Sequence, residues 1–459
     1  GCRSCQTTLL SPRKFVGDRD LVTKEIAGAV TDSRQVQKDY LFIPIKGARV
    51  DGHDFIPQVF EKGALVVLSD HALPEETGPY ILVSSTTEAM KKIAAFYRTQ
   101  LSCKVVGITG SVGKTSTKEM IASVLEQRYK VLKTEGNFNN EIGLPLTIFK
   151  IRAKHEVAVL EMGISDFGEM HRLAAMARPD IGVITNIGLC HLENLGTRDG
   201  ILQAKTEMFD HLQVDGTVIL NGDDDKLSTK KEVNGKPVIF YGVGADSAFD
   251  IKKDIYATDI ENHGLEGMCA KIHTPQGDFD AKIPIPGEHN VYNALAGTAV
   301  GLQLGLSIRE IAQGIASVQT IAGRTNLLHV KGMTVIDDCY NANPVSMKAS
   351  IDVLAHTSGR RIAVLGDMGE LGAEEKELHR SIGKAVAASG IDALFCAGTL
   401  AEEYASEAKA NPECEVHYKK TREEMTEELL AYVKEGDTVL VKASHFMEFP
   451  KVVEALTKE

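Results

Sequence analysis

The sequence predicts an α/β protein of three domains, built on open, mostly parallel sheets that are covered by helices. Three observations predict this class. The chain has 459 residues, which is enough for about three domains. Hydrophobic residues make up 43% and charged residues 25%, the balance of an ordinary globular protein. Short β-branched apolar runs alternate with segments of helical periodicity, which is typical of parallel sheets with helical connections.

Two changes in this alternation divide the chain. Residues 1–101 predict a small N-terminal α/β domain, with the apolar runs LFIPIKG and ALVVL and a closing helix over residues 86–101. Residues 102–316 predict a central domain, in which VVGIT, VAVLEMG, IGVITNI and TVILNGD form buried strands and residues 236–286 form an added antiparallel segment. Residues 317–459 repeat the alternation and predict a Rossmann-like domain that lacks a dinucleotide fingerprint.

The composition excludes several classes of function. A net charge of -12 repels a phosphate backbone, so we expect no nucleic-acid partner. The sequence has no apolar run of about 18 residues and no secretory signal, so we expect neither a membrane span nor export. The 8 cysteines are scattered, which fits reduced thiols in the cytoplasm. Cys2 and Cys5 form a lone CxxC, and without a second pair this spacing favours coincidence over a zinc site.

A glycine-rich loop between a predicted strand and a predicted helix carries the clearest chemistry. Residues 107–116 read GITGSVGKTS, close to the phosphate-loop pattern but with isoleucine at its first glycine position. Gly110 and Gly113 let successive backbone N–H groups point at one anion, and a helix N-terminus favours negative charge. The alternative is a glycine-rich turn without a ligand. We predict ATP binding, with Lys114 at the β- and γ-phosphates and Thr115 at Mg²⁺. The predicted contacts are Thr109, Gly110, Ser111, Val112, Gly113, Lys114, Thr115 and Ser116.

In the form TGxxGKT[ST], this loop resembles that of the Mur ligases and the related folylpolyglutamate synthetases. The resemblance extends over nearly the whole chain, through TDSRQVQKDYLFIPIKGARVDGHDFI, TEGNFNNEIGLPLT, EMG, HLE and AKTEMF in family order. It implies ATP-driven amide formation, in which a carboxylate attacks the γ-phosphate and an amine then displaces phosphate from the acyl phosphate. IDDCYNANPVSM and VLGDMGELG are similar to segments of the members that join D-alanyl-D-alanine to UDP-N-acetylmuramoyl-tripeptide in peptidoglycan precursor synthesis.

The resemblance also implies metal ligands. Glu161 closes a predicted strand and His191 follows another, and the family match implies that both bind Mg²⁺ beside Thr115, with two ions in all. Lys205 matches a family lysine carried as an N-carbamate, an oxygen ligand whose formation requires an amine of lowered pKa. Taken alone, these residues predict a solvated carboxylate, a hydrogen-bonding histidine and a surface lysine. The implied catalytic residues are Lys114, Glu161, His191, Lys205 and Arg324.

Further ATP contacts lie in the second half of the chain. The family binds adenine where EHNVYN opens a predicted helix, which implies that Asn290 meets the base edge; a helix-capping asparagine is the alternative. Arg324 matches the arginine that reaches the γ-phosphate, with a structural salt bridge as its alternative. Asp338 suits the ribose hydroxyls, and Tyr340 and Asn341 line the same pocket by resemblance. Because the phosphate loop and Arg324 belong to different domains, we expect domain closure to assemble the site.

The N-terminal domain resembles the uridine-nucleotide-binding module of the family. The hydroxyl of Ser33 and the guanidinium of Arg34 suit a pyrophosphate, although DSR also forms turns. Asparagines of TEGNFNNEIGLPLT suit the muramyl-peptide end or the phosphates, and loop asparagines are also common turn formers. The predicted contacts to the UDP substrate are Ser33, Arg34, Lys46, Asn137 and Asn140, supported by Asp51, His53 and Asn139.

Two other functions stay open at this point. Another ligase of the superfamily, tripeptide-forming or of the folylpolyglutamate type, shares the loop, although the DSR…DGHDF module argues against the folate enzyme. A non-enzymatic nucleotide-binding switch needs the loop but gives no reason for Glu161, His191 and Lys205 to occur together. We expect a cytoplasmic enzyme that acts as a monomer.

Overall fold

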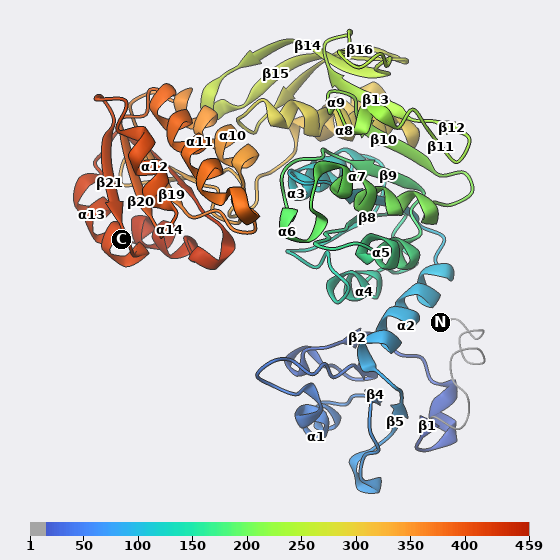
Figure 1. The fold of residues 1–459 in the computed structure, drawn as a ribbon. Coiled ribbons are helices and arrows are strands. Elements are labelled where there is room, and N and C mark those ends of the chain that lie inside the picture. The colour runs from blue at the N-terminus through green and yellow to red at the C-terminus, as the bar shows by residue number, and fades with distance from the viewer. Residues whose placement is uncertain (1–14, 459) are drawn as a thin grey trace.

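The computed structural model describes residues 15–458, and the chain forms three lobes, each built on its own sheet (Figure 1). The N-terminal lobe lies beneath the central lobe in this view, and the orange and red C-terminal lobe lies to the left. The predicted class, three α/β units with a mixed central sheet, is confirmed. The lone CxxC lies outside the described residues. Within residues 15–458, no helix is long and apolar enough to cross a membrane.

The N-terminal lobe is a five-stranded sheet of order β1-β5-β4-β3-β2, parallel except for the β1–β5 pair. The predicted apolar runs overlap β3 and β4, and the predicted closing helix is α2, which Ser85 caps by accepting from the Glu88 backbone N–H. This helix packs against α4 (Gly143–Ile148) and α5 (Glu169–Ala177) of the central lobe. The elements are β1 Phe15–Val16, η2 Arg19–Thr23, β2 Gly28–Val30, η3 Ser33–Gln35, β3 Tyr40–Phe42, η4 Gly52–Phe55, α1 Ile56–Glu61, β4 Val66–Ser69, η5 Glu75–Thr77, β5 Tyr80–Leu82 and α2 Thr86–Thr99.

The central lobe is a nine-stranded sheet of order β16-β15-β14-β13-β10-β9-β6-β8-β7. The four predicted buried strands are β6, β8, β9 and β10, and the short edge strand β7 was not predicted. Helix α3 follows β6 directly, as the phosphate-loop pattern requires. The strands are β6 Lys104–Thr109, β7 Val131–Lys133, β8 Val157–Glu161, β9 Ile181–Ile184, β10 Thr217–Asn221, β13 Ile239–Val243, β14 Ile255–Asn262, β15 Met268–Thr274 and β16 Gly277–Ile283, beside a small β11 Glu232–Val233 and β12 Lys236–Pro237 hairpin.

The prediction of an antiparallel segment over residues 236–286 is wrong for its first strand. β13 pairs in parallel with both β10 and β14, and the antiparallel part begins only with the β14–β15 and β15–β16 pairs. Phe240 packs into the core on one face of the sheet and Tyr241 into the core on the other. A strand covered on both faces is typical of parallel pairing, so β13 extends the nucleotide-binding sheet.

Helices cover both faces of the central sheet (Figure 1). The predicted helix after residue 288 is α8, which packs with α9 against α3. The helical elements are α3 Lys114–Leu125, α4 Gly143–Ile148, α5 Glu169–Ala177, α6 Leu192–Leu195, α7 Arg198–Thr206, η6 Glu207–His211, η7 Leu227–Thr229, η8 Gly264–Glu266, α8 His289–Gln303 and α9 Ile308–Ala316.

The C-terminal lobe is a six-stranded sheet of order β17-β18-β22-β19-β20-β21, parallel except for the β17–β18 pair. The four predicted strands are the inner ones, whereas the edge strands β17 and β21 carry polar residues and gave no apolar run. The elements are β17 Asn326–Val330, β18 Met333–Asp337, α10 Pro344–Ala355, β19 Arg360–Gly366, η9 Gly372–Glu374, α11 Glu375–Ala388, β20 Ala393–Ala397, α12 Ala401–Ala408, β21 Glu415–Lys419, α13 Arg422–Tyr432, β22 Asp437–Lys442, η10 His445–Met447 and α14 Pro450–Thr457.

Candidate active site

The phosphate loop joins the C-terminal end of β6 to the first turn of α3. Gly110 has a φ of +153°, and a Cβ at this position would lie 1.9 Å from the Thr185 hydroxyl oxygen, so the loop needs glycine there. Gly113 precedes α3 with a φ of +82°. The Lys114 ammonium curls back and donates to the Gly110 carbonyl at 2.9 Å. The loop therefore has the open, backbone-lined curve that a phosphate requires.

The neighbouring strand β9 holds this loop in place. The Thr185 hydroxyl donates to the Val112 carbonyl at 2.7 Å. The Asn186 side chain pairs with the backbone of Val112, accepting from its N–H and donating to its carbonyl, both at 3.0 Å. Neither residue was predicted, although both directly follow β9, and strand ends are where ligands of open α/β sheets bind.

Glu161 ends β8 and is buried beside the loop. Its Oε2 accepts from the Thr115 hydroxyl and its Oε1 from the Asn139 side chain, both at 2.9 Å. Within residues 15–458, no lysine, arginine or histidine lies within ion-pair distance of this carboxylate. A buried carboxylate surrounded by a hydroxyl and an amide, without a cationic partner, is a suitable oxygen donor for a hard divalent cation.

His191 lies between the two lobes. It precedes α6 with a φ of +53°, and its Nδ1 is 2.8 Å from Oε2 of Glu370 in the C-terminal lobe. Burial lowers the pKa of the His191 imidazole, and the charge of Glu370 opposes this shift. The neutral ring that burial favours is the form that binds metals.

Lys205 lies on α7 and is 1% exposed, which differs from a surface lysine. Among residues 15–458, no group forms a hydrogen bond or an ion pair with its ammonium. Burial lowers the Lys205 pKa to about 8, and the positive charge of Lys114 adds to the shift. The amine is therefore much more often neutral at physiological pH than an exposed lysine.

The C-terminal lobe supplies a second set of polar groups. The Arg324 guanidinium stacks over the Tyr340 ring at 4.1 Å. The Asp338 carboxylate accepts from Ser350 Oγ at 2.5 Å, from Lys442 Nζ at 2.7 Å and from the Thr325 N–H at 3.1 Å. Asp338 is thus held in one orientation at the end of β18, although its own lone pairs are largely engaged.

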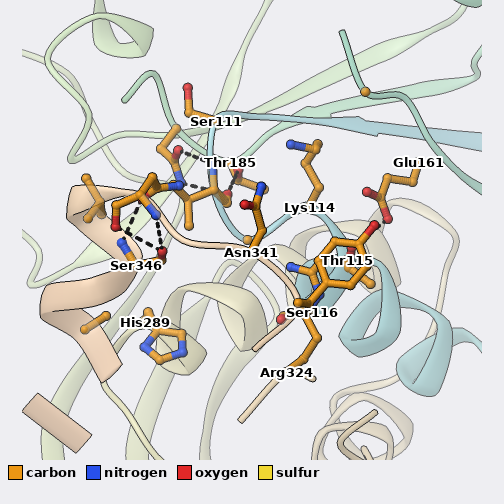
Figure 2. A pocket seen from close by; sticks show the side chains of 18 of the residues that line it. Ser111, Lys114, Thr115, Ser116, Glu161, Thr185, His289, Arg324, Asn341 and Ser346 are labelled. Carbon is orange, nitrogen blue, oxygen red and sulfur yellow. Dashed lines mark hydrogen bonds between the residues drawn. The ribbon is translucent and has the colours of Figure 1, made fainter. Parts of the chain in front are cut away.

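The central and C-terminal lobes together enclose a cavity of about 570 Å³. Figure 2 shows Lys114, Thr115 and Glu161 of the central lobe and Arg324 and Asn341 of the C-terminal lobe around it. The predicted residues on its wall are Ser111, Val112, Gly113, Lys114, Thr115, Ser116, Asn139, Asn140, Glu161, His191, Arg324, Asp338, Tyr340 and Asn341.

Four of the residues predicted to contact ATP or Mg²⁺ do not line this cavity: Thr109, Gly110, Lys205 and Asn290. The Asn290 amide is engaged inside the protein, donating to the Pro286 carbonyl and accepting from the Asn293 side chain, both at 2.8 Å. Its neighbours on α8 reach the wall in its place. Sequence reasoning missed several polar lining residues, among them Thr185, Asn186, His289, Tyr292, Asn293, Ser346, Ser350 and Lys442.

A second cavity, of about 480 Å³, lies between the N-terminal and central lobes. Gln35 and Tyr40 border it on one side, and Phe138, Lys150 and Arg152 on the other. The segment 134–147 connects the two cavities, because Asn139 and Asn140 line the first while Glu135, Phe138, Leu146 and Thr147 line the second.

The residues predicted for the UDP substrate are scattered around these cavities. Ser33 and Arg34 lie on η3 beside the second cavity, and the exposed Arg34 guanidinium pairs with Asp32 at 2.7 Å. Lys46 forms a backbone bridge with Asp51. Asn140 lines the first cavity, and its Oδ1 accepts from the N–H groups of two residues at the start of α4. Asn137 is exposed on the connecting segment, and His53 is buried elsewhere in the N-terminal lobe.

A phosphate loop at the end of a parallel strand, facing cationic and polar groups of a second lobe across one cavity, defines a multidomain nucleotide-binding protein of the P-loop class. The chain matches three family models: "Mur ligase family, catalytic domain" over residues 25–98, "Mur ligase middle domain" over 108–301 and "Mur ligase, glutamate ligase domain" over 323–445. The chain belongs to the Mur ligase family.

Full-length relatives support the same assignment. The chain is similar to the UDP-N-acetylmuramoyl-tripeptide–D-alanyl-D-alanine ligases of Bacillus subtilis, with 39% identity covering 94% of this chain and 93% of the relative, and of Escherichia coli, with 34% identity covering 95% and 96%. Among solved structures, MurF from Acinetobacter baumannii has a TM-score of 0.85 at 32% identity and covers 94% of each chain. MurF ligase from Thermotoga maritima, in complex with ADP, has a TM-score of 0.81 at 31% identity, covering 96% and 98%.

Proposed function

We propose that this protein is an ATP-dependent ligase that joins D-alanyl-D-alanine to UDP-N-acetylmuramoyl-tripeptide. The observation that carries the proposal is the cavity between the lobes, where the phosphate loop, the Glu161 carboxylate and the Arg324 guanidinium lie around one space. The curated relatives named for this reaction align over nearly the full chain, so the lobe that would bind each substrate is present.

The reaction first transfers the γ-phosphoryl group of ATP to a substrate carboxylate, giving an acyl phosphate and ADP. The amine of the dipeptide then attacks the acyl carbon, and phosphate leaves. Both steps gather negative charge at the phosphoryl oxygens, so nearby cations lower the barrier. Lys114 offers an ammonium from the central lobe and Arg324 a guanidinium from the C-terminal lobe. Because these charges come from opposite walls, closure of the lobes sets their spacing.

Three side chains of the central lobe fit a magnesium-binding role: the Thr115 hydroxyl, the Glu161 carboxylate and the His191 imidazole. Mg²⁺, when bound, neutralises part of the triphosphate charge and polarises the phosphoryl oxygens. The Asn139 amide holds Glu161 in place, and Glu370 reaches His191 from the other lobe. Because Glu370 of the C-terminal lobe contacts His191, closure of the lobes would affect the proposed metal site.

Lys205 fits the proposed carbamate. Its buried amine has no hydrogen-bond or ion-pair partner within residues 15–458, and its pKa is lowered to about 8. A neutral amine attacks CO₂ to form the carbamate anion and releases one proton, and the product offers two oxygens where an ammonium stood. The anion would also remove the repulsion between Lys205 and Lys114.

Removal of CO₂ tests this modification. Enzyme stripped of CO₂ should lose most of its activity and regain it when bicarbonate is added, and Lys205→Ala should be inactive under both conditions. Lys92→Ala, an exposed lysine on α2, is the matched control and should respond to CO₂ like the unmodified sequence. Full activity of Lys205→Ala would contradict the carbamate.

We further propose that the uridine nucleotide of the acid substrate occupies the second cavity. Arg152 brings a guanidinium to its wall, Lys150 brings an ammonium that pairs with Glu135 at 2.6 Å, and Ser33 and Arg34 lie next to the cavity. The segment 134–147 then guides the muramyl peptide toward Asn139 and Asn140 at the first cavity. Since one chain supplies every wall, a monomer suffices for activity, and because the reaction consumes ATP we expect it in the cytoplasm.

Phosphate release measured with each substrate omitted in turn tests the function. Turnover should require ATP, the UDP-linked tripeptide and D-alanyl-D-alanine together. Turnover with a single amino acid in place of the dipeptide would indicate another ligase of the family, and ATP binding without turnover would indicate a switch. Tripeptides that end in lysine or in diaminopimelate, compared at equal concentration, identify the preferred acid.

A further inference from the structure

A cluster of two histidines and an aspartate lies in the N-terminal lobe, apart from both cavities. His53 comes from η4, and Asp70 and His71 directly follow β4. One donor atom from each of the three residues lies within 4.8 Å of the other two. His53 Nε2 is 3.4 Å from Asp70 Oδ1, and that oxygen is 2.7 Å from His71 Nδ1.

The His53 imidazole has an unsatisfied nitrogen that faces this cluster. Its side chain is 6% exposed, and its Nδ1 lies 2.7 Å from the Asp51 carboxylate, so the ring proton resides on Nδ1. The Nε2 lone pair then points toward Asp70, a group that cannot donate. Within residues 15–458, Nε2 forms no hydrogen bond. A buried lone pair beside a carboxylate favours a cation between them.

We propose that His53, Asp70 and His71 form a binding site for a divalent transition-metal ion, best matched by Zn²⁺. A tetrahedral ion with bonds of about 2.1 Å separates its ligand atoms by about 3.4 Å, which is the observed distance between His53 Nε2 and Asp70 Oδ1. His71 is 56% exposed, and its Nδ1 lies 2.7 Å from Asp70 Oδ1, so the ring must turn away from that oxygen to take its place on the ion. Three protein ligands leave one position for water.

The surroundings of the cluster support a metal. The Asp51 carboxylate behind His53 is the partner that metal-bound histidines characteristically have, because it fixes the ring and raises the basicity of the other nitrogen. The Ser69 hydroxyl donates to the His71 carbonyl at 2.6 Å and accepts from its N–H at 3.3 Å, which fixes the backbone that carries two of the ligands. An ion here would join η4 to the end of β4.

Zn²⁺ binding to the full chain tests the site. The Cys2→Ser/Cys5→Ser background removes the lone CxxC as a competing ligand, and excess Mg²⁺ is added to fill the proposed magnesium site around Glu161. Isothermal titration with Zn²⁺ should detect one ion. His71→Ala removes an exposed ligand without disturbing the core and should weaken binding at least about 100-fold. Asp51→Asn still accepts from the His53 backbone and should weaken it about 10- to 100-fold.

His263 offers a matched control, since it is exposed and lies 3.3 Å from a single carboxylate, that of Glu261. His263→Ala should leave Zn²⁺ affinity unchanged. Co²⁺ in place of Zn²⁺ should give the intense visible absorption of a four-coordinate ion, and His71→Ala should abolish it. Equal Zn²⁺ affinity of the background protein and His71→Ala would overturn the proposal, as would a complete lack of binding.

Discussion

Two buried lysines, one in each lobe around the nucleotide cavity, differ in whether their ammonium group has an ion-pair partner. Lys442 is 3% exposed and donates to the Asp338 carboxylate at 2.7 Å and to the Asn341 carbonyl at 3.1 Å. Lys205 is 1% exposed and has no such partner within residues 15–458. Burial of an ammonium is unfavourable unless it is paired. The pairing therefore predicts a structural cation at Lys442 and a reactive amine at Lys205.

Lys442→Met removes the paired ammonium and should have the largest effect on stability. It leaves the Asp338 carboxylate buried without its cation and should lower the free energy of unfolding by about 3–5 kcal/mol. Urea unfolding measures this loss. The double variant Lys442→Met/Asp338→Asn removes both charges and should regain most of the stability. Unchanged stability of the single variant would show that Asp338 does not need the pair.

Lys205→Met should have the opposite effect and raise the free energy of unfolding. The pKa of Lys205 is about 8 in the folded protein against an ordinary 10.5, so the unfolded chain binds this proton more tightly. Without CO₂ and metal, the variant should be more stable by about 3 kcal/mol at pH 7. Stability of the unmodified protein should rise as pH climbs from about 8 to 10.5. Unfolding measured at pH 7 and pH 10 should show the difference between the two proteins shrink.

Arg324→Ala tests whether the Arg324 charge contributes to catalysis or to stability. The guanidinium stacks on Tyr340 at the cavity wall and has no ion-pair partner within residues 15–458. We expect kcat to fall about 100-fold, since a cation aimed at the phosphoryl oxygens is lost. The unfolding midpoint should change little. A large drop in stability with normal kcat would assign Arg324 a structural role.

Ser350→Ala should have the smallest effect. The hydroxyl donates to Asp338 at 2.5 Å, beside the stronger contact from Lys442. Loss of one hydrogen bond to a charged acceptor should lower stability by about 1–2 kcal/mol. Thermal unfolding measures it, and KM for ATP reports whether the orientation of Asp338 matters for binding. A loss as large as that of Lys442→Met would mean that the hydroxyl, rather than the ammonium, holds the carboxylate.

Local patterns predicted most of the fold and the loop. The glycines at 110 and 113, the strand before them and the helix after them lie within a few residues of one another, so spacing alone located the loop. Glu161 was placed correctly at a strand end for the same reason. The edge strands β17 and β21 were missed because half-exposed strands carry polar residues. The predicted domain boundaries at residues 101 and 316 stay predictions.

Side-chain environment was harder to predict, because it depends on how distant segments pack. Taken alone, Lys205 is predicted to be a surface lysine, because the sequence of α7 does not indicate that this side chain faces the interior. The motif around Asn290 predicted the right helix, but the amide turns inward and His289 lines the cavity instead. The His53–Asp70–His71 cluster joins residues from two segments that sequence spacing does not connect.

The segment 134–147 borders both cavities, and we expect this arrangement to select substrates by the length of their peptide. In the proposed binding mode, an acid anchored by its nucleotide near Phe138 must carry a stem long enough to reach Asn139 at the first cavity. A stem shorter by one residue loses about 3.5 Å and stops short of the loop. We expect a UDP-muramyl dipeptide to bind with near-normal affinity in a displacement assay and to turn over poorly, so that length, rather than side-chain recognition, selects the acceptor.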